Sequence, residues 1–105
     1  MTVDASYAAV LRRSRRRAIL EILLGTAENG ADEVTLEPVL EARRIYGSDR
    51  GAIRAEIMWL AEQGLVAMED IGGVYFCKLL PAGESIARGK RVHPDIAKPT
   101  ARWNG

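Results

Sequence analysis

The chain has 105 residues, a net charge of +1 and one cysteine. This length is enough for one domain with one modest core, and the apolar content of 48% argues against wholesale disorder. A single cysteine excludes an internal disulfide and a cysteine-rich metal site, and no apolar run approaches the roughly 20 residues that span a membrane. The basic cluster follows the first apolar residues, so we expect no signal peptide. The lone cysteine fits a reducing cytoplasm, which is the expected location.

Residues 4–24 are expected to form a long first helix. A stripe at helical spacing runs along it, comprising Tyr7, Val10, Leu11, Ser14, Ala18 and Ile22. Residues 19–24 are apolar nearly all round, which predicts that the C-terminal half is buried while the N-terminal half lies on a surface. Gly25 is the expected stop. The side of the helix opposite the stripe should carry Arg12, Arg13, Arg16 and Arg17.

Five arginines fall within residues 12–17, and like charges three or four positions apart destabilise a helix. Three interpretations are open. The cluster is a solvated face whose long stems cover apolar surface, a patch that contacts phosphates or another polyanion, or a surface for acidic patches on a partner chain.

A second and a third helix should follow in quick succession. Residues 25–34 are a polar connection with a short strand near Val34, and Thr35 is the expected N-cap of the second helix. Tyr46-Gly47 should close that helix, and Ser48 or Asp49 should cap the third, which ends before Gly64. Two helices joined by so short a turn form a helix-turn-helix.

The third helix has an apolar side formed by Ile53, Ile57 and Leu60, and Arg50 and Arg54 flank it. A guanidinium matches guanine edges and phosphates with two parallel hydrogen bonds, so these arginines are candidate base or phosphate contacts. The alternative is a pair of solvated arginines, partnered by Glu56 or Glu62.

Met58 and Trp59 are apolar where a groove-binding helix often carries polar residues. Trp59 either packs against a neighbouring element or joins Met58 in an exposed patch that binds a partner protein.

Strand, turn and strand follow the third helix. Residues 65–68 are strand-like, Gly72-Gly73 is a turn, and residues 74–76 begin the return strand, in which Cys77 should be a buried small hydrophobe. The hairpin tip carries Glu69 and Asp70 and no arginine, so this wing is expected to complete the core rather than probe a minor groove.

Pro81 can open a fourth helix that Gly89 ends. Residues 90–105 form a basic C-terminal tail, in which Ile96 and Trp103 could anchor the segment on its own domain or on a partner. His93 is the sole histidine and has no evident partner ligand, so we expect no metal site. No catalytic pattern is present, and we expect neither an enzyme, nor a cofactor, nor a small-molecule ligand.

The segments IMWLAEQGLVAMEDIGGV and LLPAGESIARGK resemble a family of small proteins from Mu-like phages and prophages, which are similar to ArsR-type winged-helix regulators. The resemblance covers roughly residues 7–92. It implies a winged-helix domain in a phage setting, without an established biochemical role. The cysteine ligand motif of metal-sensing ArsR proteins is missing, which removes the argument for metal sensing.

The sequence therefore predicts an α+β winged helix in residues 1–89, with three helices, a β-hairpin wing and a fourth helix. The leading function is binding of double-stranded DNA by a small homodimeric transcriptional regulator, through Arg50, Arg54 and the phosphate-contacting arginines of the first helix. Tyr7, Val10, Leu11, Ile96 and Trp103 are the candidate dimer surfaces. The alternative is a phage structural, assembly or protein-interaction module that uses Met58 and Trp59. A basic face continuous from the first helix to Arg50 and Arg54 would favour DNA, and separated clusters would favour protein.

Overall fold

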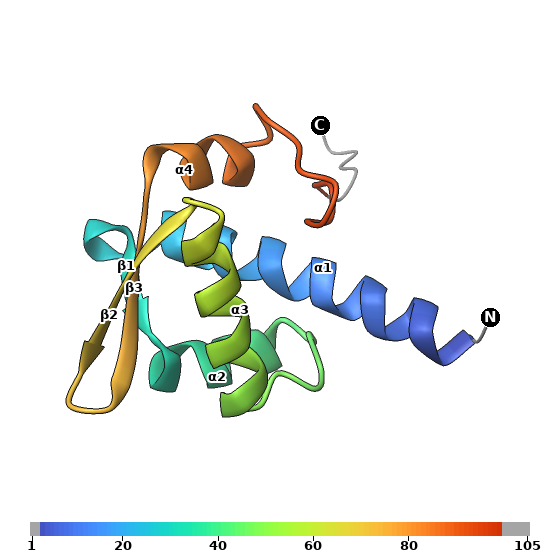
Figure 1. Cartoon of the computed structure of the whole chain (residues 1–105), viewed down its shortest axis with the longest axis horizontal. Helices are drawn as coiled ribbons and strands as arrows, with labels where there is room; N and C mark the ends of the chain where they lie inside the picture. The colour runs from blue at the N-terminus through green and yellow to red at the C-terminus, as the bar shows by residue number, and fades with distance from the viewer. Residues whose placement is uncertain (1–2, 100–105) are drawn as a thin grey trace.

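The computed structural model describes residues 3–99, with side chains from Tyr7 onward. Four α-helices, one short 3-10 helix and a three-stranded antiparallel sheet make up an α+β fold (Figure 1). In chain order the elements are α1 (Val3–Leu24), η1 (Ala27–Asn29), β1 (Gly30–Asp32), α2 (Glu33–Ala42), α3 (Arg50–Glu62), β2 (Val66–Ile71), β3 (Val74–Leu79) and α4 (Pro81–Ala87). This order is compatible with a winged-helix arrangement. Trp103 lies outside the described residues.

The core lies where α1, α2, α3 and α4 meet one face of the sheet. Its fully buried side chains include those that the apolar spacing predicted for α3, together with the C-terminal half of α1: Ile19, Leu20, Leu23, Leu36, Leu40, Ile53, Ile57, Leu60 and Ile86. The N-terminal half of α1 extends beyond this body (Figure 1), with Tyr7 and Val10 exposed. The predicted division of α1 into a buried half and a surface half is therefore confirmed.

The hairpin forms at the predicted glycines. Gly72 and Gly73 both have positive φ, at 60° and 88°, which suits the tight two-residue turn that joins Ile71 to its partner Val74. β3 is the central strand, because β1 pairs with its other edge. Cys77 on β3 is fully buried as predicted, and burial raises the pKa of its thiol to about 12.

Two predicted boundaries around α2 are wrong. The strand is Gly30–Asp32 rather than a segment near Val34, because Ala31 pairs with Cys77 of β3. α2 then begins at Glu33, and its N-cap is Asp32, whose Oδ1 accepts a hydrogen bond from the backbone N of Thr35 at 2.7 Å. The helix ends at Ala42 rather than near Tyr46, because Arg44 adopts a left-handed φ of 63°.

The expected ends of the other helices are confirmed. α1 ends at Leu24, directly before Gly25. Asp49 caps α3, with its Oδ1 accepting from the backbone N of Ala52 at 2.8 Å. Pro81 opens α4. Within α4, a Cβ on Gly83 would lie 2.1 Å from the carbonyl oxygen of Leu65, so the close approach of α4 to the start of the hairpin requires glycine here.

Residues 90–99, called here the C-terminal segment, lie against the helices. The backbone N of Ala97 donates to the carbonyl oxygen of Arg13 at 3.1 Å, and the side chain of Ile96 is 4% exposed as part of the core. Ile96 thus anchors the segment on its own domain, which removes it as a dimer surface.

Candidate nucleic-acid interface

The exposed side of α3 is set by the burial of its opposite side. Because Ile53, Ile57 and Leu60 face the core, helical geometry turns Met58 toward solvent and leaves Arg54 at the margin. Arg50 is also exposed, as the first residue of the helix. We call this surface the α3 face, comprising Arg50, Arg54, Ala55, Met58 and Glu62.

Arg54 is held at the junction of three elements. Its Nε and Nη2 donate to the two carboxylate oxygens of Glu33, at 3.0 and 2.5 Å, and Nη2 also donates to the carbonyl oxygen of Gly73 at 2.8 Å. The guanidinium carbon lies 4.1 Å from the ring centre of Tyr75. Arg54 therefore ties α3 to the start of α2 and to the hairpin.

Glu33 is the buried partner in this junction, with a fully buried side chain. The hydrogen bond from Arg54 lowers the pKa of its carboxyl below the ordinary value, against the opposing effect of burial, and the backbone N–H of Tyr75 lowers it further. The same hydrogen bond raises the pKa of Arg54. A charged, two-point contact of this kind fixes the orientation of the guanidinium. Within residues 3–99, no hydrogen bond occupies its Nη1, which leaves one donor edge for a ligand.

Arg50 is less constrained. Its one ion pair within the described chain is with Glu37, at 3.5 Å, and its side chain is 47% exposed. Glu56 and Glu62, the partners named in the alternative interpretation, form no ion pair with Arg50 or Arg54 within residues 3–99. The partners are Glu37 and Glu33, because α2 packs beside α3 and presents both carboxylates to it.

Arg15 and Arg16 of α1 converge on one carboxylate. Glu56 is 4% exposed, and its oxygens accept from Arg15 Nη1 at 3.2 Å and from Arg16 Nε at 2.7 Å. Arg15 also donates to the hydroxyl of Ser48 at 3.0 Å and to the carbonyl of Gly47 at 3.2 Å. These contacts bind α1 to α3 and to the turn that precedes it.

Arg16 and Arg17 also hold the C-terminal segment. Arg16 Nη1 donates to the carbonyl of Asp95 at 3.1 Å, and Arg17 Nε donates to that of Ala97 at 2.5 Å. Arg17 Nη2 further donates to the carbonyl of Ile86 in α4 at 2.7 Å. The sequence assigned Arg16 and Arg17 to phosphates, but acceptors in α3, α4 and the C-terminal segment take up most of their donors.

Arg12 and Arg13 differ from the rest of the cluster. Arg12 is exposed and Arg13 is half-buried, and neither side chain forms an ion pair or a hydrogen bond with any residue in the range 3–99. Of the four arginines that the sequence assigned to phosphates, these two keep their donors free.

Trp59 packs within its own chain. Arg16 lies 3.8 Å from the centre of its ring, and the ring of His93 meets it edge to face at 5.3 Å. His93 Nε2 is also 3.2 Å from Oε1 of Gln63. The first alternative for Trp59 is thus confirmed, while its neighbour Met58 is 43% exposed.

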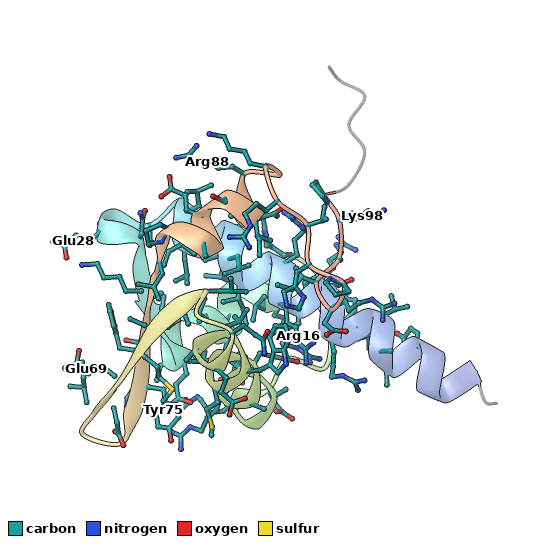
Figure 2. The ribbon with its side chains drawn as sticks, turned by 45° about the horizontal axis from the view of Figure 1, so that its top comes forward. Arg16, Glu28, Glu69, Tyr75, Arg88 and Lys98 are labelled. Atoms are coloured by element: carbon teal, nitrogen blue, oxygen red, sulfur yellow. The ribbon has the colours of Figure 1, made fainter. Side chains whose placement is uncertain are left out.

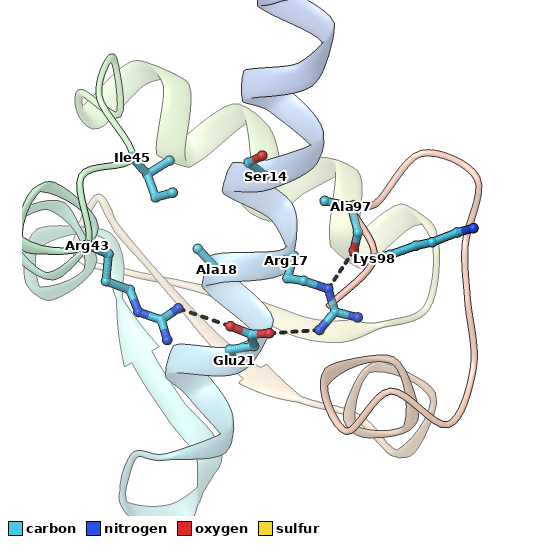
Figure 3. Close-up of a pocket in the computed structure, with 8 residues that line it drawn as sticks. All are labelled: Ser14, Arg17, Ala18, Glu21, Arg43, Ile45, Ala97 and Lys98. Carbon is cyan, nitrogen blue, oxygen red and sulfur yellow. Dashed lines mark hydrogen bonds and ion pairs between the residues drawn. The ribbon is translucent and has the colours of Figure 1, made fainter. Parts of the chain in front are cut away.

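A cavity of about 280 Å³ lies between α1, the end of α2 and the C-terminal segment (Figure 3). In this cavity the carboxylate of Glu21 forms two ion pairs, accepting from Arg17 Nη1 at 2.8 Å and from Arg43 Nη1 at 3.3 Å. One carboxylate thus pairs with two arginines, and it ties α1 to the residue that directly follows α2.

The sequence did not identify Glu33 as the buried partner of Arg54, and it offered Glu56 as a partner of the arginines on the third helix rather than of Arg15 and Arg16. For Glu56 a signal was present, since it lies three residues after Ile53 and four before Leu60, within the buried side of α3. Glu33 follows a three-residue strand that the sequence placed near Val34 instead, and nothing local marks Glu33 as buried. Among residues 3–99, no three His, Cys, Asp or Glu side chains form a group that could hold a metal ion.

Comparison with known proteins gives one informative relative. The chain is 35% identical over 95 residues to the uncharacterized protein gp26 of Escherichia phage Mu, which covers 89% of this chain and 95% of the phage protein. No family model matches the chain, and no solved structure matches it significantly. Within residues 3–99, none of the helices has both the length and the apolar character needed to cross a membrane.

Proposed function

We propose that this chain, which belongs to the family of the phage Mu protein gp26, is a winged-helix DNA-binding protein and acts as a small transcriptional regulator of a phage or prophage. The order of α2, α3 and the β2–β3 hairpin supports the winged-helix assignment. In such folds the helix equivalent to α3 enters a major groove.

The observation that carries this proposal is the fixed position of Arg54. An arginine that reads a base loses less entropy on binding when a second residue already holds its guanidinium. Glu33, Gly73 and Tyr75 hold Arg54 in this way at the margin of the α3 face, and its Nη1 edge remains available for an acceptor such as guanine O6 or N7. Arg50, at the first residue of the same helix, supplies a second and more mobile contact.

The active species in this proposal is a homodimer in the cytoplasm of the host cell. Two copies related by two-fold symmetry would read two half-sites and so multiply a limited affinity. The projecting half of α1, with Tyr7, Val10 and Leu11, is the surface available for that pairing. The proposal requires no enzymatic activity and no cofactor.

Selection from a random duplex library tests the proposal. We expect the protein to enrich a sequence. Arg54→Lys keeps the charge but loses the two-point contact with Glu33 that fixes the Nη1 donor, so it should lower discrimination against a scrambled duplex roughly 5-fold, the lower end for a specific base contact. Arg88→Lys is the matched control, because Arg88 is an exposed arginine directly after α4, outside the α3 face. Failure to enrich any sequence, or equal selectivity of Arg54→Lys and the wild type, would refute the role of the α3 face.

A second candidate function is binding of a partner protein through the α3 face. Two observations favour it: Arg15, Arg16 and Arg17 are withdrawn into internal contacts, which breaks a basic face between α1 and Arg54, and Met58 is exposed. An assembly partner would meet Met58 beside the exposed charges of Arg50 and Glu62 on this face. Loss of partner capture on Met58→Asp, with unchanged DNA binding, would support this candidate.

A further inference from the structure

Positive charge is concentrated in two segments of the chain that lie close together in the folded molecule. Residues 12–13 and 88–99 together carry six Lys or Arg residues and one acid, whereas the whole chain has a net charge of +1, so the remainder is acidic overall. Figure 2 shows Arg88 and Lys98 on the same side of the molecule, away from Glu69 on the hairpin. A phosphate backbone therefore finds its electrostatic match on this side of the molecule rather than at the wing.

The C-terminal segment brings these cations together. The hydrogen bond from Ala97 N to the carbonyl of Arg13 sets Lys98 beside α1. At the other end, a Cβ on Gly89 would lie 3.5 Å from Pro99, so Lys90 and Lys98 belong to neighbouring stretches of chain. Both lysines are exposed, and neither forms an ion pair with the part of the chain that the structure describes.

The same segment runs along a flank of α3. His93 contacts Trp59 and Gln63, both in or directly after the last turn of that helix. A duplex seated on the α3 face would thus have the C-terminal segment beside it. DNA carries one negative charge per roughly 1.7 Å of its axis, so cations spread over such a flank meet several phosphates.

We infer that the C-terminal segment, together with Arg12 and Arg13, forms a phosphate-binding flank for duplex DNA, which we call the basic flank: Arg12, Arg13, Lys90, Arg91 and Lys98. This inference rests on the proposed function. Arg16 and Arg17 are positioning residues in it, because they hold the segment by its carbonyls at Asp95 and Ala97 and do not contact phosphate themselves.

The basic flank and the α3 face should have different roles in DNA binding. Contacts to phosphates fix a protein on the duplex without regard to sequence, whereas contacts to base edges discriminate. The basic flank should therefore contribute equally to the binding of every duplex, and the α3 face should contribute the preference.

The test compares two double variants of the full chain that remove the same charge. Lys90→Gln/Lys98→Gln changes the basic flank, and Arg44→Gln/Lys78→Gln changes two exposed cations elsewhere. A random-sequence duplex is titrated by fluorescence anisotropy across a series of salt concentrations. Each lost phosphate contact makes the slope of log K against log salt shallower by about 0.9, so we expect a change of about 1.8 for the flank variant. The control should retain the wild-type slope.

Thermal melting of both variants, expected within a few degrees of the wild type, shows that they are folded. Equal slopes for the flank variant and the wild type would overturn the inference and leave the role of α3 intact. Absence of any duplex binding by the wild-type protein would overturn the proposed function, and the inference with it.

Discussion

Glu56→Gln should destabilise the fold more than any other change of one charge on α3. The carboxylate of Glu56 is buried and is the shared acceptor of Arg15 and Arg16, which are themselves 8% and 12% exposed in their side chains. Glutamine keeps the shape and one acceptor oxygen, but it places an NH₂ group against the second guanidinium and removes the negative charge. Two nearly buried arginines are then left without a counter-ion.

Breaking a buried ion pair by removing one partner costs about 3–5 kcal/mol, because the remaining charge stays desolvated. The Gln variant retains one hydrogen bond, so we expect the lower end, about 3 kcal/mol of unfolding free energy. For a domain of this size each kcal/mol lowers Tm by about 4–8 °C, which gives a fall of roughly 12–24 °C.

Urea unfolding followed by far-UV circular dichroism measures the difference. Glu62→Gln is the matched control, since Glu62 is exposed on the same helix and forms no ion pair within residues 3–99. A destabilisation by Glu56→Gln no larger than that of the control would show that the two arginines are solvated, and that the link between α1 and α3 does not exist in solution.

Four further outcomes follow from the same contacts. Leu60→Ala should cost about 2–5 kcal/mol through lost burial and the cavity left behind, measured by urea unfolding, and a shift typical of a surface alanine would contradict the placement of α3. Folding lowers the pKa of Glu33, so the charged carboxylate stabilises the fold at pH values above the ordinary carboxyl pKa. This stabilisation is lost as the pH falls through the lower pKa of the folded state. The difference in unfolding free energy between wild type and Glu33→Gln should therefore narrow from pH 6 to pH 3. Cys77, with its pKa raised to about 12, should resist a thiol reagent at pH 8 until the protein unfolds, and prompt labelling would contradict its burial. Light scattering at tens of micromolar should report a dimer that Tyr7→Glu converts to a monomer, and a wild-type monomer would remove the dimer from the proposal.

Much of the fold was predictable because its signals are local. The spacing of Ile53, Ile57 and Leu60 oriented α3, and the Gly72-Gly73 pair located the turn. Each of these depends on residues within one or two turns of each other, where periodicity and glycine conformation act directly.

The arrangement of the arginines was not predictable, because their partners are distant in sequence. Arg16 pairs with Glu56 across 40 positions, and Arg17 reaches Ala97 across 80. Several acceptors are backbone carbonyls, which every residue carries and which no sequence pattern marks. A dense run of arginines suggested an outward, phosphate-seeking surface, whereas the fold uses three of the five as internal braces.

Binding to duplex DNA is the central claim, and an anisotropy titration of a labelled random-sequence duplex with wild-type protein at low salt tests it most directly. The account predicts saturable binding at micromolar protein, with log K falling linearly as log salt rises, because phosphate contacts release condensed counterions. No change in anisotropy at tens of micromolar protein and about 50 mM salt would contradict the claim, and the exposed Met58 on the α3 face would then be the surface to examine for a protein partner.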